Sequence, residues 1–191
     1  MRRPLATLAC LLLAAAASTA QAAVVNAANV GTFTTFQDTN TGRVWLDMNN
    51  FFNQTPASMV ASASAAGFTF ATKTDVQALL FSLPLGIGDW TTYKSIMGDA
   101  PNRELIWGAY DDGDNDPTMA GWAYAFDTHN SWQFVDATWS MNAVPNGDGE
   151  FADMNIWAYQ TGNISVPEPA SLALMGLGLA GLAALRRRKY A

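Results

Sequence analysis

The densest group of chemically active side chains is an acidic run at residues 111–116, which reads Asp-Asp-Gly-Asp-Asn-Asp. Asp112, Asp114 and Asp116 alternate along this run, and alternating carboxylates that supply oxygen ligands are typical of loops that wrap Ca²⁺. The EF-hand pattern then fails, because Pro117 follows the third aspartate where glycine is needed, and no glutamate stands at the last ligand position. The run therefore predicts a solvated acidic turn between two strands. A calcium site at the three aspartates is the alternative, and no other cofactor is expected.

Catalytic chemistry has few other residues to use. His129 is the only histidine, and the only cysteine, Cys10, lies in an N-terminal segment that we expect to be removed. Cys-His catalysis and a zinc site with several histidines are therefore excluded. A Ser-His-Asp triad would have to use His129, and no Gly-x-Ser-x-Gly elbow is present. Carboxylates are so numerous that a glycosidase-like pair is expected by chance. We predict no catalytic residues.

The seven tryptophans offer a second kind of binding chemistry, and all of them lie between Trp45 and Trp157. Aromatic faces stack on the apolar faces of sugar rings, while neighbouring aspartate and asparagine side chains bind the hydroxyl groups. Aromatic residues at alternating strand positions are more often part of the core. We therefore expect most tryptophans to be buried, and one or two exposed ones beside the acidic run would be enough for glycan binding.

Charge is distributed unevenly along the 191 residues. Between residues 23 and 166 the basic residues are Arg43, Lys73, Lys94 and Arg103, whereas fifteen of the 16 acidic residues fall there. Such an acidic surface repels nucleic acid and anionic lipid, both of which need basic patches. The composition excludes a nucleic-acid partner and suits divalent cations or neutral glycans.

The first 22 residues have the three parts of a secretory signal peptide. Arg2-Arg3 forms a charged start, an apolar segment covers residues 5–17, and small residues surround the expected cleavage point, namely Ala20, Ala22 and Ala23. We predict that the secretory translocon exports the chain and that residues 1–22 are removed. The mature domain then has no disulfide, so its stability must come from packing.

The last 26 residues have a different order of parts. The motif Val166, Pro167, Glu168 and Pro169 is held extended by its prolines, which fix φ and remove backbone donors. Residues 170–185 form an apolar run that, as a helix, is about 24 Å long and only just able to span a bilayer. A basic stop follows at Arg186, Arg187, Arg188 and Lys189, and basic residues stay on the cytoplasmic side.

This order of parts closely resembles the PEP-CTERM protein-sorting signal, which has a Pro-Glu-Pro motif, a short transmembrane helix and an arginine-rich end. Pro167, Glu168 and Pro169 match its motif. The resemblance implies that a membrane peptidase, exosortase, recognises the tail and removes the helix. The protein would be anchored transiently in the inner membrane and then reach the cell envelope or the outside, usually in Gram-negative bacteria that make exopolysaccharide. The resemblance therefore predicts where the protein is sent and not what the exported domain does.

Helix signals are concentrated in the first half of the domain. Thr55-Pro56 supplies an N-cap and a proline at the first helical position, so we predict a helix over residues 57–66. Thr72 and Asp75 form a capping box before a second helix that ends ahead of Pro84. A short third helix is predicted at residues 90–97.

Strand signals follow the helices. Residues 38–42 have turn chemistry and precede a short strand at 44–46, which makes a hairpin. Aromatic, strand-like segments then occur in the second half of the domain, at 105–110, 121–126, 132–135 and 155–159. Helices early and antiparallel strands late indicate an α+β fold, with two early helices packed on a mainly antiparallel sheet.

A second resemblance covers the first half of the domain. Asp-x-x-Thr-Gly-x-x-Trp-Leu-Asp at residues 38–47, Ala-Ala-Gly-Phe at 65–68 and Ala-Thr-x-x-Asp-Val-Gln-Ala-Leu at 71–79 resemble an uncharacterised ectodomain often carried by PEP-CTERM proteins. That ectodomain is similar to domains with a C-type-lectin-like fold. The resemblance implies such a fold here and does not by itself give a function.

Together these patterns divide the chain into a signal peptide at residues 1–22, an exported α+β domain at 23–165 and a sorting tail at 166–191. We expect a non-enzymatic structural or glycan-binding component of an extracellular polysaccharide matrix. A secreted carbohydrate-active hydrolase, with carboxylates as acid and base, is the alternative.

Overall fold

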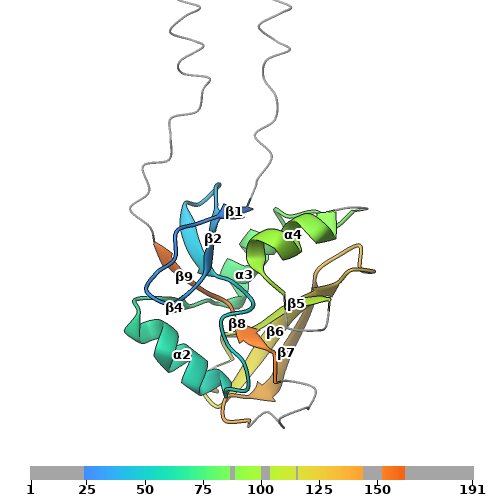
Figure 1. Cartoon of the computed structure of the whole chain (residues 1–191). Coiled ribbons are helices and arrows are strands. Elements are labelled where there is room, and N and C mark those ends of the chain that lie inside the picture. The colour runs from blue at the N-terminus through green and yellow to red at the C-terminus, as the bar shows by residue number, and fades with distance from the viewer. Residues whose placement is uncertain (1–23, 87–88, 100–103, 115, 144–151, 162–191) are drawn as a thin grey trace, which may run out of the picture.

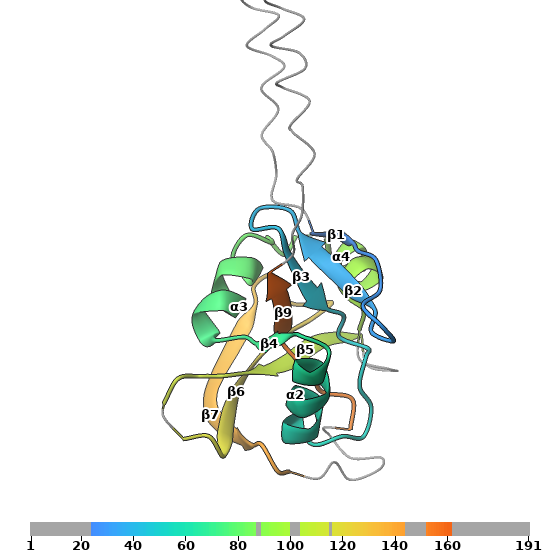
Figure 2. The same ribbon diagram turned by 90° about the vertical axis from the view of Figure 1, so that its left-hand side faces the viewer.

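The computed structural model describes residues 24–86, 89–99, 104–114, 116–143 and 152–161. The expected signal peptide and sorting tail lie outside these residues. Within them, three helices and nine strands form an α+β domain with two sheets, drawn in two views in Figures 1 and 2. No helix among the described residues is long and apolar enough to cross a membrane.

The first sheet contains strands from both ends of the domain. Its strands are β1 (Val24–Asn26), β2 (Thr35–Asp38), β3 (Arg43–Leu46), β4 (Thr69–Phe70) and β9 (Ala158–Thr161). Their order is β1-β2-β3-β9-β4, and every neighbouring pair is antiparallel. The predicted hairpin is confirmed as β2 and β3. Its turn contains Gly42 at φ 72, a left-handed conformation that glycine adopts at little cost.

The second sheet contains the aromatic segments of the second half. Its strands are β5 (Leu105–Tyr110), β6 (Met119–Phe126), β7 (Gln133–Ser140) and β8 (Asn155–Ile156). The order is β7-β6-β5-β8, with only β5 and β8 parallel. The prediction of a single sheet was therefore wrong. The antiparallel strands are divided between two sheets that share a core.

Two of the three helices begin directly after the predicted capping residues. In α2 (Pro56–Ala65), the Thr55 hydroxyl accepts the backbone N–H of Ser58, and in α3 (Lys73–Leu80) Thr72 and Asp75 form the predicted capping box. The short helix expected before the second sheet is present as α4 (Asp89–Met97). Val76, Leu79 and Leu80 of α3 are buried, as their helical spacing predicts.

The chain crosses from one sheet to the other at Trp157. Residues 155–159 were predicted as one strand, but β8 pairs with β5 and β9 pairs with β3 and β4. Between them, the Trp157 N–H donates to the carbonyl of Ala109 in β5 at 2.8 Å, while its carbonyl accepts the N–H of Ala71 at 2.9 Å. The N–H of Trp157 therefore bonds to the second sheet, and its carbonyl bonds to the segment after β4. These opposed bonds divide the extended segment into β8 and β9.

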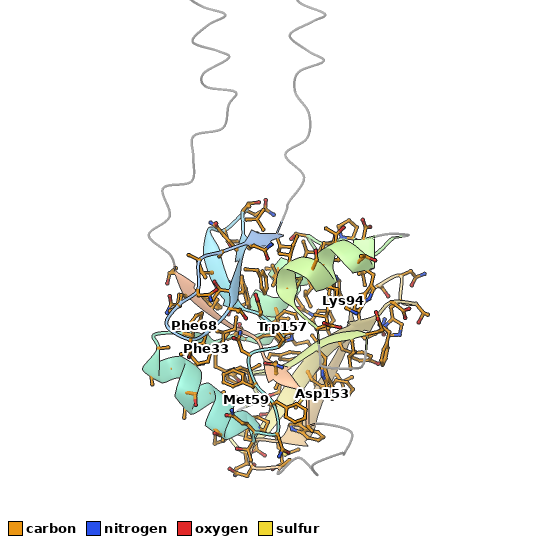
Figure 3. The ribbon with its side chains drawn as sticks, viewed as in Figure 1. Phe33, Met59, Phe68, Lys94, Asp153 and Trp157 are labelled. Atoms are coloured by element: carbon orange, nitrogen blue, oxygen red, sulfur yellow. The ribbon has the colours of Figure 1, made fainter. Side chains whose placement is uncertain are left out.

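The side chain of Trp157 fills the space between the sheets and is fully buried (Figure 3). Its ring packs edge-on against Trp45 at 6.4 Å, and its Nε1 donates to the carbonyl of Ala123 at 3.4 Å. Gly108 makes this packing feasible, because a Cβ there would lie 3.1 Å from the indole. A second group of apolar side chains lies near α2, where Phe68 and Phe33 meet edge-on at 6.0 Å.

Candidate functional site

The acidic run forms the loop between β5 and β6, as the sequence predicted. Its first residue, Asp111, is fixed by two backbone bonds to the segment that joins β4 to α3. Its N–H donates to the carbonyl of Ala71 at 2.9 Å, and its carbonyl accepts the N–H of Lys73 at 2.8 Å. At its far end, the carbonyl of Thr118 accepts the N–H of Met141, the residue after β7. The loop is therefore held at both ends by neighbouring elements.

Within this loop the carboxylates bond to the backbone of the loop itself. Asp111 accepts the N–H of Gly113 at 3.0 Å, and Asp114 accepts that of Asp116 at 2.8 Å. Asp116 accepts both the N–H and the hydroxyl of Thr118, and these bonds lower the pKa of Asp116. The loop is thus a series of turns in which each aspartate bonds two residues ahead.

The three predicted calcium ligands all lie in this loop. Asp114 and Asp116 are exposed and Asp112 is half-buried. The described part of the chain contains no group of three or more His, Cys, Asp or Glu side chains placed to hold a metal ion. Calcium binding by this loop stays the untested alternative to a solvated turn.

An open cavity of about 390 Å³ lies beside the loop. Its lining comes from β4, the acidic loop, the start of β6 and the residue after β7: Phe70, Asp111, Gly113, Asp116, Pro117, Met119 and Met141. Phe70, Met119 and Met141 are half-buried, whereas the loop residues are exposed. The lining of the cavity therefore combines apolar side chains with two aspartates.

A cavity lined by both apolar side chains and aspartates is suited to a polyhydroxylated ligand. An aromatic ring and two methionines can contact the C–H faces of a sugar, and carboxylate oxygens with remaining lone pairs can accept its hydroxyl groups. An anionic ligand is disfavoured, because no basic residue of the described chain lines the cavity. The basic residues of the described chain, Arg43, Lys73 and Lys94, are each engaged in an ion pair with an acidic side chain.

Most of the tryptophans are core residues. Five are buried, namely Trp45, Trp90, Trp107, Trp132 and Trp157. Trp122 and Trp139 are half-buried, and neither lines the cavity beside the acidic loop. The aromatic residue that lines that cavity, among the described residues, is Phe70, and the sequence gives no sign of its place there.

Three aromatic residues form a row on β6, of which Trp122 and Tyr124 are half-buried and Phe126 is exposed. Trp122 and Tyr124 stack on each other with centroids 4.7 Å apart and planes 20° apart, and Phe126 meets Tyr124 edge-on at 5.7 Å. Rings that stack along one strand turn their faces towards each other. A flat sugar platform needs faces directed to solvent, so this row is less suited to stacking than the cavity.

His129 follows β6 in a turn, where its N–H donates to the carbonyl of Phe126 at 3.0 Å. Its ring packs against Tyr124 and Phe126, with centroids 5.7 and 5.1 Å away. Its Nδ1 is buried and has no hydrogen-bond partner among the described residues. A triad histidine needs a carboxylate partner at that nitrogen, so this ring is packed as an aromatic side chain.

Asp47 is a buried carboxyl group whose pKa is shifted strongly upward. It lies directly after β3, only 9% exposed, and its Oδ1 has no hydrogen-bond partner among the described residues. Burial raises the pKa of Asp47 from 3.8 to about 6, against a smaller lowering by the Thr34 hydroxyl. In the sequence Asp47 is only the last residue of the 38–47 motif, and the packing alone shows that it is buried.

Comparison with known protein families identifies a family match for one part of the chain, its C-terminal tail. Residues 165–189 match the model of the PEP-CTERM protein-sorting motif. The chain carries a PEP-CTERM sorting signal. No curated protein and no solved structure matches the chain.

The PEP-CTERM signal marks the protein for export and for processing by exosortase, a membrane protease. The match contains the sorting motif, Val166 to Pro169, together with the basic stop at residues 186–189. These residues, the predicted helix at 170–185 and the signal-cleavage residues Ala20, Ala22 and Ala23 lie outside the described residues, so their geometry is untested.

Proposed function

We propose that the exported domain is a non-enzymatic, glycan-binding component of an extracellular polysaccharide matrix, and that the glycan binds in the cavity beside the acidic loop. The observation that carries this proposal is the lining of the cavity. Its lining combines Phe70 and two methionines with Asp111 and Asp116 around one open depression. Sugar-binding sites combine these two kinds of surface, since a sugar ring has apolar C–H faces and a polar rim.

The charge of the cavity narrows the class of glycan. Asp111 and Asp116 line it, and no basic residue among the described ones does, so uronic-acid or sulfated polymers would be repelled. Neutral oligosaccharides can donate hydroxyl groups to the carboxylates without that cost. The proposal is therefore specific to glycans without anionic groups.

A glycan array probed with the secreted mature protein tests this proposal. We expect binding to neutral oligosaccharides, at least tenfold weaker binding after Asp116→Asn combined with Phe70→Ala, and little binding to anionic polymers. Asp127→Asn is the matched control, because Asp127 is an exposed carboxylate in the turn after β6 and does not line the cavity. Absence of binding to any glycan would contradict the proposal.

A secreted carbohydrate-active hydrolase is the second candidate, since Asp111 and Asp116 line the same cavity. A glycosidase needs one carboxyl group with a raised pKa as its general acid. The hydrogen bonds from Thr118 lower the pKa of Asp116, so Asp116 is poorly suited to act as the general acid. Release of reducing sugar that is lost in Asp111→Asn would favour the hydrolase over the binding protein.

For the tail, we propose transient anchoring by a helix at residues 170–185 and cleavage near Pro167-Glu168-Pro169. The matched sorting motif and the apolar run after it support this order. Replacing all three motif residues by alanine should leave the protein in the membrane fraction with its C-terminus intact. Mass spectrometry of the mature wild-type protein is the decisive measurement, and retention of residues 170–191 would mean that the tail is a permanent anchor.

We also propose that the exported domain is C-type-lectin-like. The α+β class, with the helices mainly in its first half and a mainly antiparallel second sheet in its second half, supports the proposal. An experimental structure of the secreted protein, compared with lectin-like domains, would decide.

A further inference from the structure

Both ends of the described chain lie at one end of the first sheet. Val24 of β1 pairs with Asp38 of β2, and Thr161 of β9 pairs with Arg43 of β3. Asp38 and Arg43 flank the same hairpin turn, so Val24 and Thr161 are three strand spacings apart, roughly 15 Å. We call the surface formed by Val24, residues 38–43 and Thr161 the terminal end.

The acidic loop and its cavity lie away from the terminal end. Met119, the first residue of β6, pairs with Ser140, the last of β7, and the carbonyl of Met141 accepts the N–H of Ala57 in α2. Figure 1 shows α2 and these ends of β6 and β7 at the bottom of the molecule, whereas β1 and the end of β9 are at its top. Figure 2 shows the same separation after a quarter turn.

The sorting motif follows the terminal end closely. Five residues separate Thr161 from Pro167, so even a fully extended chain keeps the motif within about 20 Å of the sheet. β9 cannot be drawn out to lengthen this spacer without breaking two ladders, because it pairs with β3 on one side and β4 on the other. The guanidinium of Arg43 covers the ring of Tyr159 at 4.0 Å and adds to this attachment.

The terminal end differs in charge from the rest of this acidic domain. Its exposed turn residues, Thr39, Asn40 and Thr41, are uncharged. Asp38 is only 3% exposed and accepts the backbone N–H of Asn40 and the hydroxyl of Thr41. Arg43 is paired with Asp75 at 2.7 Å. A neutral surface can approach a membrane-embedded protein without the repulsion that the acidic loop would meet at an anionic surface.

We propose that the terminal end is the surface which the folded domain presents to the membrane peptidase that processes the tail, and that the five-residue spacer sets the gap between them. The peptidase must reach a motif that stands within about 20 Å of a folded sheet. The acidic loop and its cavity then point away from the membrane and are open to ligands before the tail is released. This inference rests on the sorting motif and the strand register, and it does not need the glycan proposal.

A spacer series in cells that contain the peptidase tests the gap. Deleting residues 162–164 shortens the reach to about 10 Å and should slow tail removal at least tenfold. Replacing the same three residues by Gly-Ser-Gly keeps the length and should be processed like the wild type. Wild-type processing of the deletion variant would overturn the proposal. Equally slow tail removal in the replacement variant would also overturn it, because the peptidase would then recognise the sequence of the spacer and not its length. Thermal melting of both variants checks that the domain stays folded.

A bulky adduct tests the surface itself. The mature chain has no cysteine, so Thr41→Cys at the terminal end and Asn142→Cys after β7 can each be labelled alone with a long polyethylene glycol maleimide. Both positions are exposed. Uncleaved protein from cells without the peptidase is labelled and mixed with membranes that contain it. We expect the Thr41 adduct to be cleaved about tenfold more slowly than the Asn142 adduct, with the unlabelled variants cleaved alike. Equal rates for the two adducts would overturn the proposal.

Discussion

The junction at Trp157 and the acidic loop are neighbours that are built in opposite ways. Both are bonded to the same short segment, because the N–H of Ala71 donates to Trp157 and its carbonyl accepts from Asp111. At the junction, Trp157 is fully buried and bonded to three separate parts of the chain. Its N–H, its carbonyl and its indole N–H bond to Ala109, Ala71 and Ala123 respectively. In the loop, exposed carboxylates bond to the backbone of their own turns.

The difference separates the part of the domain that carries stability from the part that is available for binding. Removing a buried side chain exposes neighbours on every side and leaves a cavity, so its cost is large. Changing an exposed loop residue loses one local bond that water can replace, so its cost is small. The loop can therefore vary in sequence while the junction keeps its position.

Trp157→Ala should have the largest effect of any single change in this comparison. We expect it to lower the free energy of unfolding by about 3–5 kcal/mol, because it removes the side chain that both sheets contact. Trp122→Ala is the control, since Trp122 is half-buried and should cost about half as much. Chemical denaturation of the secreted domain measures both. A loss below about 1 kcal/mol for Trp157→Ala would mean that the junction does not carry the stability assigned to it.

Two glycines give a finer test of the same contrast. A Cβ on Gly121 would lie 2.4 Å from the ring of Tyr110, whose hydroxyl is fixed by a 2.7 Å bond to Asp136. Gly121→Ala should therefore cost about 2–3 kcal/mol through overpacking. Gly113 in the acidic loop has φ 75 and nothing within 4 Å of its Cβ position, so Gly113→Ala should cost only about 1 kcal/mol of backbone strain. Thermal melting of the two variants side by side would show whether this order holds.

Asp47 adds a pH dependence to the stable part of the domain. Its pKa of about 6 in the folded state exceeds the ordinary 3.8, so the folded protein binds more protons between these values and loses stability as the pH rises through them. Asp47→Asn should therefore raise the free energy of unfolding at pH 7 by about 1–2 kcal/mol and have little effect near pH 4. Urea titrations at the two pH values measure the difference. An equal effect at both would show that the carboxyl group is not the cause.

Local chemistry predicted the elements of the fold well. Thr55-Pro56, the Thr72–Asp75 capping box and the 38–42 turn each act within a few residues, and each begins or links an element where expected. The split of residues 155–159 could not be predicted in this way. It depends on Ala109 and Ala71, which lie far away in the chain and bond opposite sides of Trp157.

The same limit applies to the candidate site. The acidic loop was visible in the sequence, but its cavity also needs Phe70 and Met141, which different elements bring to it. Asp47 was similarly hidden, because an Asp after a short strand is ordinarily exposed and only tertiary packing buries it here.

Calcium provides the smallest expected effect and the most direct test of the acidic loop. If Asp112, Asp114 and Asp116 coordinate Ca²⁺ in the folded state alone, a hundredfold excess over Kd stabilises the domain by about 2.7 kcal/mol and raises its melting temperature by several degrees. In the described geometry Asp114 and Asp116 already accept backbone N–H groups of the loop, and a cation would have to compete with those bonds. We therefore expect the same melting curve in EDTA, Mg²⁺ and Ca²⁺ at matched ionic strength. Asp114→Ala is the control, because a rise that is specific to Ca²⁺ and absent from this variant would establish the calcium site and assign the loop a structural ion.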